Sequence, residues 1–128
     1  MTNDYETYDN HTKDQLIAAL RDPATKGHRG TIVYHLWSKK LDCSDIIPEL
    51  VECIIGGSYE EVNHAVHILE EQQSFFNDLT VIGAAIDSLE AAPLSNNEFR
   101  EDGMGYAHDY LSDRLNKLEG NQDEYHNQ

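Results

Sequence analysis

The sequence predicts an all-α protein built from about six helices. Three observations indicate this class. Apolar residues recur at helical spacing in six segments, two of these segments begin with a capping box, and strict strand-like alternation is nearly absent. At 128 residues the chain is long enough to form one domain with a hydrophobic core of its own.

Two helices are expected in the first part of the chain, over residues 12–21 and 30–40. Thr12 and Gln15 have the spacing of a capping box, and Pro23 stops the first helix. The second segment starts with β-branched residues but lacks the alternation of a strand. The apolar faces of the two helices are predicted to consist of Leu16, Ile17, Leu20, Val33, Leu36 and Trp37.

The middle of the chain predicts helices over 44–55 and 58–73. Pro48 falls in the first turn, where proline is tolerated, and two consecutive glycines end the first of these helices. Ser58 and Glu61 form the second capping box. The predicted buried residues are Leu50, Val51, Ile54, Ile55, Val62, Ala65, Val66 and Leu69.

The last two helices are expected over 78–91 and from residue 98 or 103 to Leu118. Pro93 stops the first, and Gly103 and Gly105 weaken the opening turns of the second, which leaves its start open. The predicted inward residues are Leu79, Ile82, Ile86, Leu89, Tyr106, Ala107, Tyr110, Leu111 and Leu115.

The six segments repeat as three pairs. The aligned first members begin at Leu16, Leu50 and Ile82, which are 34 and 32 residues apart. The aligned second members begin at Val33, Val66 and His108. A repeat of this length is typical of stacked antiparallel helical hairpins, which would place the second helices along one concave surface. An up-and-down helical bundle is the alternative.

The whole chain, 1–128, is expected to be a single domain with flexible tails over 1–10 and 120–128. The first ten residues are polar and acidic, unlike a signal peptide, and no apolar stretch could cross a bilayer. We therefore expect a cytoplasmic protein. Cys43 and Cys53 show no zinc or disulfide pattern, and buried reduced thiols are the expected state.

The charge distribution points to a basic partner. The formal net charge is −15, and no lysine or arginine occurs between Lys40 and Arg100, a stretch with twelve aspartates and glutamates. Such a charge disfavours direct binding to nucleic acid or to an anionic membrane, and it accelerates the approach of a cationic protein. Solubility alone is the simpler explanation of an acidic composition.

The turn Leu-Arg-Asp-Pro-Ala-Thr-Lys-Gly-His-Arg-Gly-Thr at 20–31 resembles the inter-helix turn of small bacterial HEAT-like repeat proteins. The similarity continues through Leu-Asp-Cys-Ser at 41–44 and Gly-Gly-Ser-Tyr-Glu at 56–60, and it covers about residues 16–71. The resemblance implies a HEAT-like α-solenoid of three hairpins. The second repeat departs from the generic pattern, because it has Glu-Glu-Val-Asn-His at 60–64 where a basic residue is common.

Proteins of this kind include immunity proteins of contact-dependent growth inhibition and other polymorphic toxin systems. The resemblance therefore implies a cognate toxin domain as partner, a basic nuclease and most plausibly a ribonuclease, which the acidic surface would block. A HEAT-like scaffold or regulatory adaptor for another protein is the alternative. A small lyase or hydrolase on helical repeats is a third possibility.

The candidate binding residues gather on the fourth predicted helix. Glu61 and His64 have the Glu-x-x-His spacing of a di-metal bundle, but no second copy of that motif exists, and no nucleophile motif occurs. We therefore expect no metal, cofactor or catalytic residue, and instead a polar face that binds a partner. Trp37 is expected in the core, whereas Tyr34 and Tyr59 could be anchors. The predicted partner-binding residues are Tyr34, Tyr59, Glu60, Glu61, His64, His67, Glu70, Glu71, Asp102, Asp109 and Asp113.

Overall fold

The computed structural model describes residues 7–93 and 95–126, with side chains as far as residue 120. The main helices are α2 (Lys13–Arg21), α3 (Arg29–Ser38), α4 (Ile47–Gly56), α5 (Tyr59–Glu71), α6 (Leu79–Ala91) and α7 (Glu98–His126). Short 3-10 turns lie at Pro23–His28 and Gln73–Phe75. None of the described residues forms a strand, so the predicted all-α class and its six main helices are confirmed.

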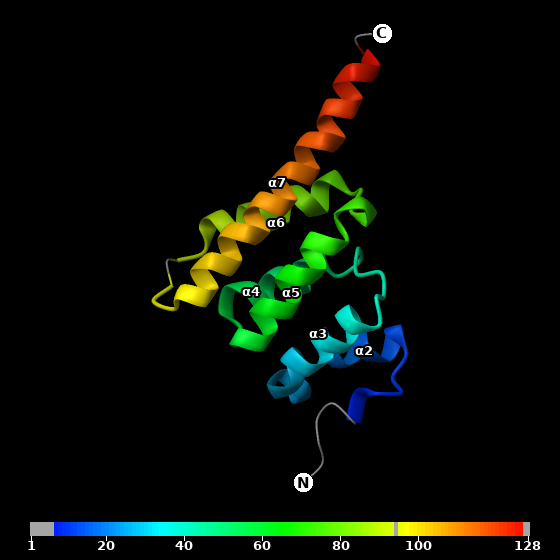
Figure 1. The fold of residues 1–128 in the computed structure, drawn as a ribbon, viewed down its shortest axis with the longest axis vertical. Helices are drawn as coiled ribbons and strands as arrows, with labels where there is room; N and C mark the ends of the chain where they lie inside the picture. Colours follow the sequence, from blue (N-terminus) through cyan, green and yellow to red (C-terminus); the bar gives the residue numbers. More distant parts are fainter. Residues whose placement is uncertain (1–6, 94, 127–128) are drawn as a thin grey trace.

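The helices pack as three hairpins, α2 with α3, α4 with α5 and α6 with α7. The second helices lie side by side, since α5 contacts α3 on one flank and α7 on the other, and α4 contacts α6. Figure 1 shows α5 between α3 and α7, and α7 extending beyond the other helices. These contacts agree with the predicted hairpins, and the solenoid remains a prediction.

The core is a single apolar cluster that all six helices share. Its largest fully buried side chains are Phe76, Leu16, Ile32, Leu36, Ile46, Ile47, Leu50, Ile54, Ile68, Leu69, Ile82 and Leu111. The prediction that Tyr106 points inward is wrong, because 55% of this residue is exposed. Trp37 is only partly buried and packs at the edge of the core.

The segment before α2 belongs to the fold, in contrast to the predicted flexible arm over 1–10. Tyr8 is 3% exposed, and its hydroxyl lies 2.9 Å from Nδ1 of His28. The ammonium group of Lys39 donates to the carbonyl oxygen of Asp9 at 2.7 Å. Residues 1–6 of that predicted arm lie outside the described residues.

Several helix bounds differ from the sequence predictions by a few residues. Helix α4 begins at Ile47 instead of Ser44, because the Ser44 amide donates to the Asp42 carboxylate at 2.9 Å in a turn. Helix α3 ends at Ser38 in a left-handed turn at Lys40. Helix α7 starts at Glu98 and continues to His126 through most of the predicted 120–128 tail, whose residues 127–128 are outside the described part.

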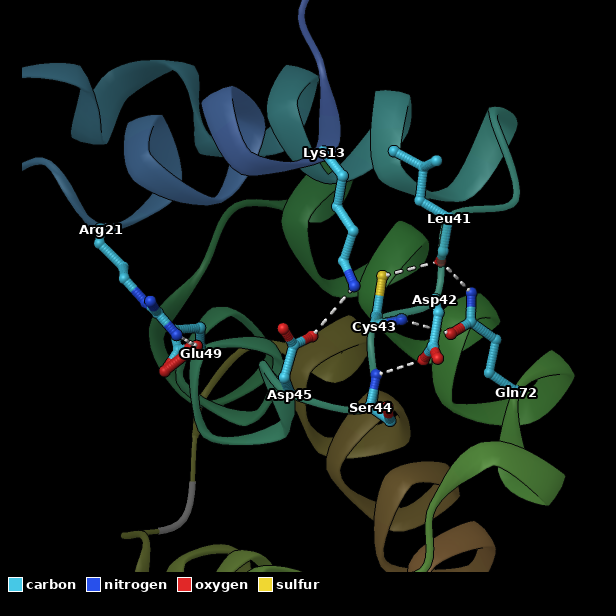
Figure 2. Close-up of polar contacts among 9 residues, drawn as sticks. All are labelled: Lys13, Arg21, Leu41, Asp42, Cys43, Ser44, Asp45, Glu49 and Gln72. Atoms are coloured by element: carbon cyan, nitrogen blue, oxygen red, sulfur yellow. Dashed lines mark hydrogen bonds and ion pairs between the residues drawn. The ribbon is translucent and has the colours of Figure 1, made fainter.

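The loop between α3 and α4 is held by the end of α5 (Figure 2). Gln72 is 7% exposed; its side-chain oxygen accepts from the Cys43 amide at 2.8 Å, and its amide nitrogen donates to the Leu41 carbonyl at 2.8 Å. Burying an amide that uses both its donor and its acceptor fixes the loop in one position.

Among the described residues, no helix is both long and apolar enough to span a membrane.

Candidate protein-binding surface

The candidate site is an open groove of about 460 Å³ between α5 and α7. Its floor contains Val62 and Gly103, which are both buried, and Val66. A Cβ atom at Gly103 would lie 2.4 Å from Cγ1 of Val62. The glycine therefore allows α7 to approach α5 closely at this point. Four aromatic residues line the groove: Tyr59, Phe99, Tyr106 and Tyr110.

The aromatic rings are arranged in two pairs. The rings of Tyr106 and Tyr110 are nearly parallel, at 16° with centroids 6.4 Å apart, and Tyr59 meets Phe99 edge to face at 5.7 Å. Tyr59 is 63% exposed and Tyr106 is 55% exposed. Tyrosine is among the residue types that most often anchor a protein partner, and an exposed group of aromatic side chains commonly marks an interaction site.

Polar groups of the groove come from both helices: Asn63, His67, Glu70 and Asp102. The hydroxyl of Tyr110 donates to Oε2 of Glu70 at 2.5 Å. This hydrogen bond, together with desolvation, raises the pKa of Tyr110 to about 12, so the hydroxyl stays protonated and keeps donating at neutral pH. The Glu70 carboxylate is therefore oriented by a tyrosine, a neutral donor, and its negative charge is not cancelled.

The opposite flank of α5 carries a second group of side chains, which we call the Trp37 cluster: Tyr34, Trp37, His64, His67 and Glu71. The rings of His64 and His67 each stack on Trp37 with centroids 5.5 Å apart, and the Trp37 indole N–H donates to Glu71. Tyr34 meets His64 edge to face at 5.3 Å. This cluster occupies the contact between α3 and α5, and it explains why Trp37 is only half inside the core.

Burial lowers the pKa of His64, and the neighbouring His67 lowers it further, whereas Glu60 acts in the opposite direction. Nδ1 of His64 is buried and has no hydrogen-bond partner within the described residues. Both observations favour a neutral ring at pH 7, so His64 contributes shape and stacking to this flank.

The structure divides the predicted binding residues among several places. Tyr59, His67, Glu70 and Asp102 line the groove. Tyr34, His64 and Glu71 belong to the Trp37 cluster, which His67 also joins. Asp109 and Asp113 are exposed on α7, at helical spacing from Asp102, and so continue the same face. The polar face expected on α5 is divided between two flanks, because α3 and α7 both pack against this helix.

Glu60 and Glu61 lie in the first turn of α5, away from the centre of the groove. Glu60 lies over Gly30 at the start of α3. A Cβ atom added to Gly30 would be 3.0 Å from the Cβ atom of Glu60. Glu61 is half-buried and contributes to the electrostatic environment of Arg29.

Arg29 is the buried cation that sequence reasoning did not single out. It is 8% exposed, donates to Sγ of Cys53 at 3.2 Å and pairs with Oε1 of Glu52 at 3.7 Å. Burial opposes its charge, but Cys53, Glu52 and Glu61 outweigh that effect and raise the pKa of Arg29 overall. The guanidinium group thus ties α3 to α4.

Neither thiol is a candidate nucleophile. Burial raises the pKa of Cys53 to about 11, although Arg29 opposes the shift, and burial raises the pKa of Cys43 to about 12. Both are free and buried, as the sequence predicts. Within the described part of the chain, no three His, Cys, Asp or Glu side chains are grouped so as to hold a metal ion.

Sequence reasoning also missed Phe99 and Asn63 as parts of the groove. The signal for Phe99 was present, because residues 99, 103, 106 and 110 recur at helical spacing and so lie on one face of α7.

Comparison with protein-family models, with curated proteins and with solved structures found no match. Function is therefore inferred from the chemistry of this surface.

Proposed function

We propose that this protein binds a basic partner protein through α5 and α7, and that it serves as an immunity protein against a basic toxin domain. The observation that carries the proposal is the groove, where exposed tyrosines stand beside Glu70 and Asp102. No lysine or arginine is among the described residues that line it. An aromatic and acidic concavity of this kind complements an interface rich in lysine or arginine.

The proposed partner is a ribonuclease domain, because an enzyme that holds RNA presents a basic surface to the phosphates. Asp102, Asp109 and Asp113 are exposed along α7 and extend the acidic face past the groove. Carboxylates on this face would occupy the positions that phosphates take in the substrate complex. The net charge of −15 would speed the encounter by electrostatic steering.

Inhibition of this kind needs no chemistry from the protein, no cofactor and no metal. It requires only that the acidic face covers the active site of the toxin, in the cytoplasm of the cell that makes both proteins. The two cysteines, whose pKa values are raised by burial, take no part.

A scaffold or adaptor role is the second candidate. The Trp37 cluster favours it, because this cluster lies on the other flank of α5 and Glu71 is exposed there. A protein with a different surface on each side of one helix could hold two partners at once.

The test is growth of cells that express the ribonuclease domain encoded beside this gene, with and without this protein. We expect full protection by the wild type. The variant Glu70→Lys/Asp102→Lys should lose protection and should no longer retain the toxin domain in a pull-down.

The matched control is Asp14→Lys/Asp87→Lys, which makes the same charge change at exposed positions of α2 and α6. It should protect as well as the wild type. A second variant, Glu60→Lys/Glu61→Lys/Glu71→Lys, tests the other acids of α5. Absence of protection by the wild type would refute the immunity role, and capture of a different, non-toxin partner by the same surface would favour the adaptor role.

A further inference from the structure

We propose that the groove between α5 and α7 receives one arginine side chain of the basic partner. This inference rests on the proposed function, in that it names the group that the acidic surface recognises. Three features of the groove suit an arginine side chain: an apolar floor, an exposed flat ring and an oriented carboxylate. The ring and the carboxylate favour arginine over lysine.

The floor suits the aliphatic part of a long cationic side chain. Val62 is 4% exposed and lies beside Gly103, and with Val66 these residues form the apolar base of an open groove of about 460 Å³ between the helices. The stem of an arginine or lysine would lose water-exposed apolar area against this floor while its charged head stays near the rim.

The rim offers a planar surface for the head group. Tyr106 is 55% exposed, and its ring is held nearly parallel to that of Tyr110 at 16°. A guanidinium group is planar and weakly hydrated and stacks on aromatic faces, whereas an ammonium group is compact and strongly hydrated. The ring of Tyr106 therefore favours arginine.

The carboxylates supply the charge. Tyr110 donates to Oε2 of Glu70 and so fixes the direction of that carboxylate, which leaves its second oxygen to accept from the partner. Asp102, which is exposed on α7, lines the groove from the other helix. A guanidinium group can donate to the free oxygen of Glu70 from its edge while its face lies against a ring, whereas an ammonium group has no flat face to offer.

The experiment is an NMR titration of the ¹⁵N-labelled full chain with three capped tripeptides, acetyl-Gly-Xaa-Gly-amide, where Xaa is arginine, lysine or citrulline. Citrulline has nearly the shape of arginine without its charge. We expect the arginine peptide to shift amides around Asn63, Val66 and Gly103, with a Kd roughly threefold or more below that of the lysine peptide. The citrulline peptide should bind most weakly.

Variants assign the preference to the groove. Tyr106→Ala should reduce the difference between arginine and lysine, and Asp102→Asn should weaken both peptides. The exposed α6 substitution Asp87→Asn, which makes the same charge change, should leave both unchanged. Equal affinities for arginine and lysine, or shifts spread evenly over the acidic surface, would overturn the inference.

These outcomes are separate from those of the protection assay, because the peptides need no toxin. Selective binding of the arginine peptide without protection from the toxin would retain the arginine site and refute the immunity role. Protection by Tyr106→Ala and Asp102→Asn equal to that of the wild type would leave the immunity role standing and overturn the groove as its recognition site.

Discussion

Lys40 ends helix α3 in a left-handed conformation, with φ of 55°. The Leu41 amide donates to the Leu36 carbonyl at 3.1 Å, and the Lys40 amide donates to the Trp37 carbonyl at 3.0 Å. This is the hydrogen-bond pattern of a Schellman motif, in which glycine usually holds the position of Lys40. The side chain therefore costs conformational energy at this residue.

We predict that Lys40→Gly has a free energy of unfolding about 1 kcal/mol higher than Lys40→Ala, because only glycine relieves the left-handed strain. The alanine variant is the control, since both substitutions remove the same positive charge. Urea unfolding followed by circular dichroism gives both values. Equal stabilities of the two variants would show that the turn carries no strain.

His64 makes the stability of the fold dependent on pH. Burial holds its pKa below the ordinary value of 6.5, and His67 adds to the effect while Glu60 opposes it. The unfolded chain therefore binds a proton near pH 6.5 that the folded chain does not yet accept. The contribution of His64 is complete above that pH and is lost as the pH falls through the unfolded value towards the folded one.

We predict that the free energy of unfolding of the wild type falls, relative to that of His64→Gln, as the pH is lowered from 7.5 to 5. The His64 ring should also show an NMR titration midpoint below about 6.5. The stacked Trp37 ring provides a third readout, because protonation of His64 should change its fluorescence. A midpoint at or above 6.5 would contradict this account.

At the scale of elements, two of the glycines in helix α7 have opposite roles. A Cβ at Gly103 would lie 2.4 Å from Cγ1 of Val62, whereas a Cβ at Gly105 would meet nothing within 4 Å. Gly105→Ala should raise the free energy of unfolding by about 1 kcal/mol through helix propensity. Gly103→Ala should lower it by about 1 kcal/mol or more, because overpacking outweighs the same propensity gain.

The comparison of the two alanine variants by thermal and urea unfolding is internally controlled, since both make the same substitution in one helix. Val62→Ala combined with Gly103→Ala should recover part of the loss, because it removes the methyl group that clashes. Stabilisation by both single variants would mean that α7 does not pack closely on α5 at Gly103.

The helices themselves could be predicted because their signals are local. The capping box predicted at Thr12 and Gln15 forms completely, and at the second predicted box Ser58 accepts from the Glu61 amide at 3.3 Å without the return bond from the Glu61 side chain. The candidate site was predicted only in part. Both flanks of α5 carry polar residues. The sequence around α5 contains no signal that His64 faces α3 and that Glu70 faces α7. That division depends on which helices pack beside α5, a property of the whole fold.

Across the whole molecule, two groups of acids in the stretch without lysine or arginine have different partners. Those at the start of the second hairpin pair with cations of the first: Asp45 with Lys13 at 3.6 Å, Glu49 with Arg21 at 3.3 Å and Glu52 with Arg29 at 3.7 Å. Figure 2 shows the first two pairs bridging the hairpins. On α5, Glu70 and Glu71 accept from neutral donors, Tyr110 and Trp37.

This arrangement predicts opposite effects for two triple variants of equal net charge. Asp102→Asn/Asp109→Asn/Asp113→Asn removes exposed acids of α7, which form no ion pair with another described residue. It should raise the free energy of unfolding at low salt, because it relieves repulsion in a chain of charge −15. The second variant, Asp45→Asn/Glu49→Gln/Glu52→Gln, should lower it, since it removes the partners of Lys13, Arg21 and the buried Arg29.

Urea unfolding of both variants at 20 mM and 500 mM NaCl tests the prediction. We expect the two to differ by about 1 kcal/mol at low salt, because exposed ion pairs contribute only tenths of a kcal/mol each and the Glu52 carboxylate that pairs with Arg29 is itself 72% exposed. Salt should reduce the gain of the α7 variant, since screening already relieves the same repulsion in the wild type. If both variants changed stability by the same amount and in the same direction, net charge alone would matter. The difference between the paired acids Asp45, Glu49 and Glu52 and the available acids on α5 and α7 would then have no energetic basis.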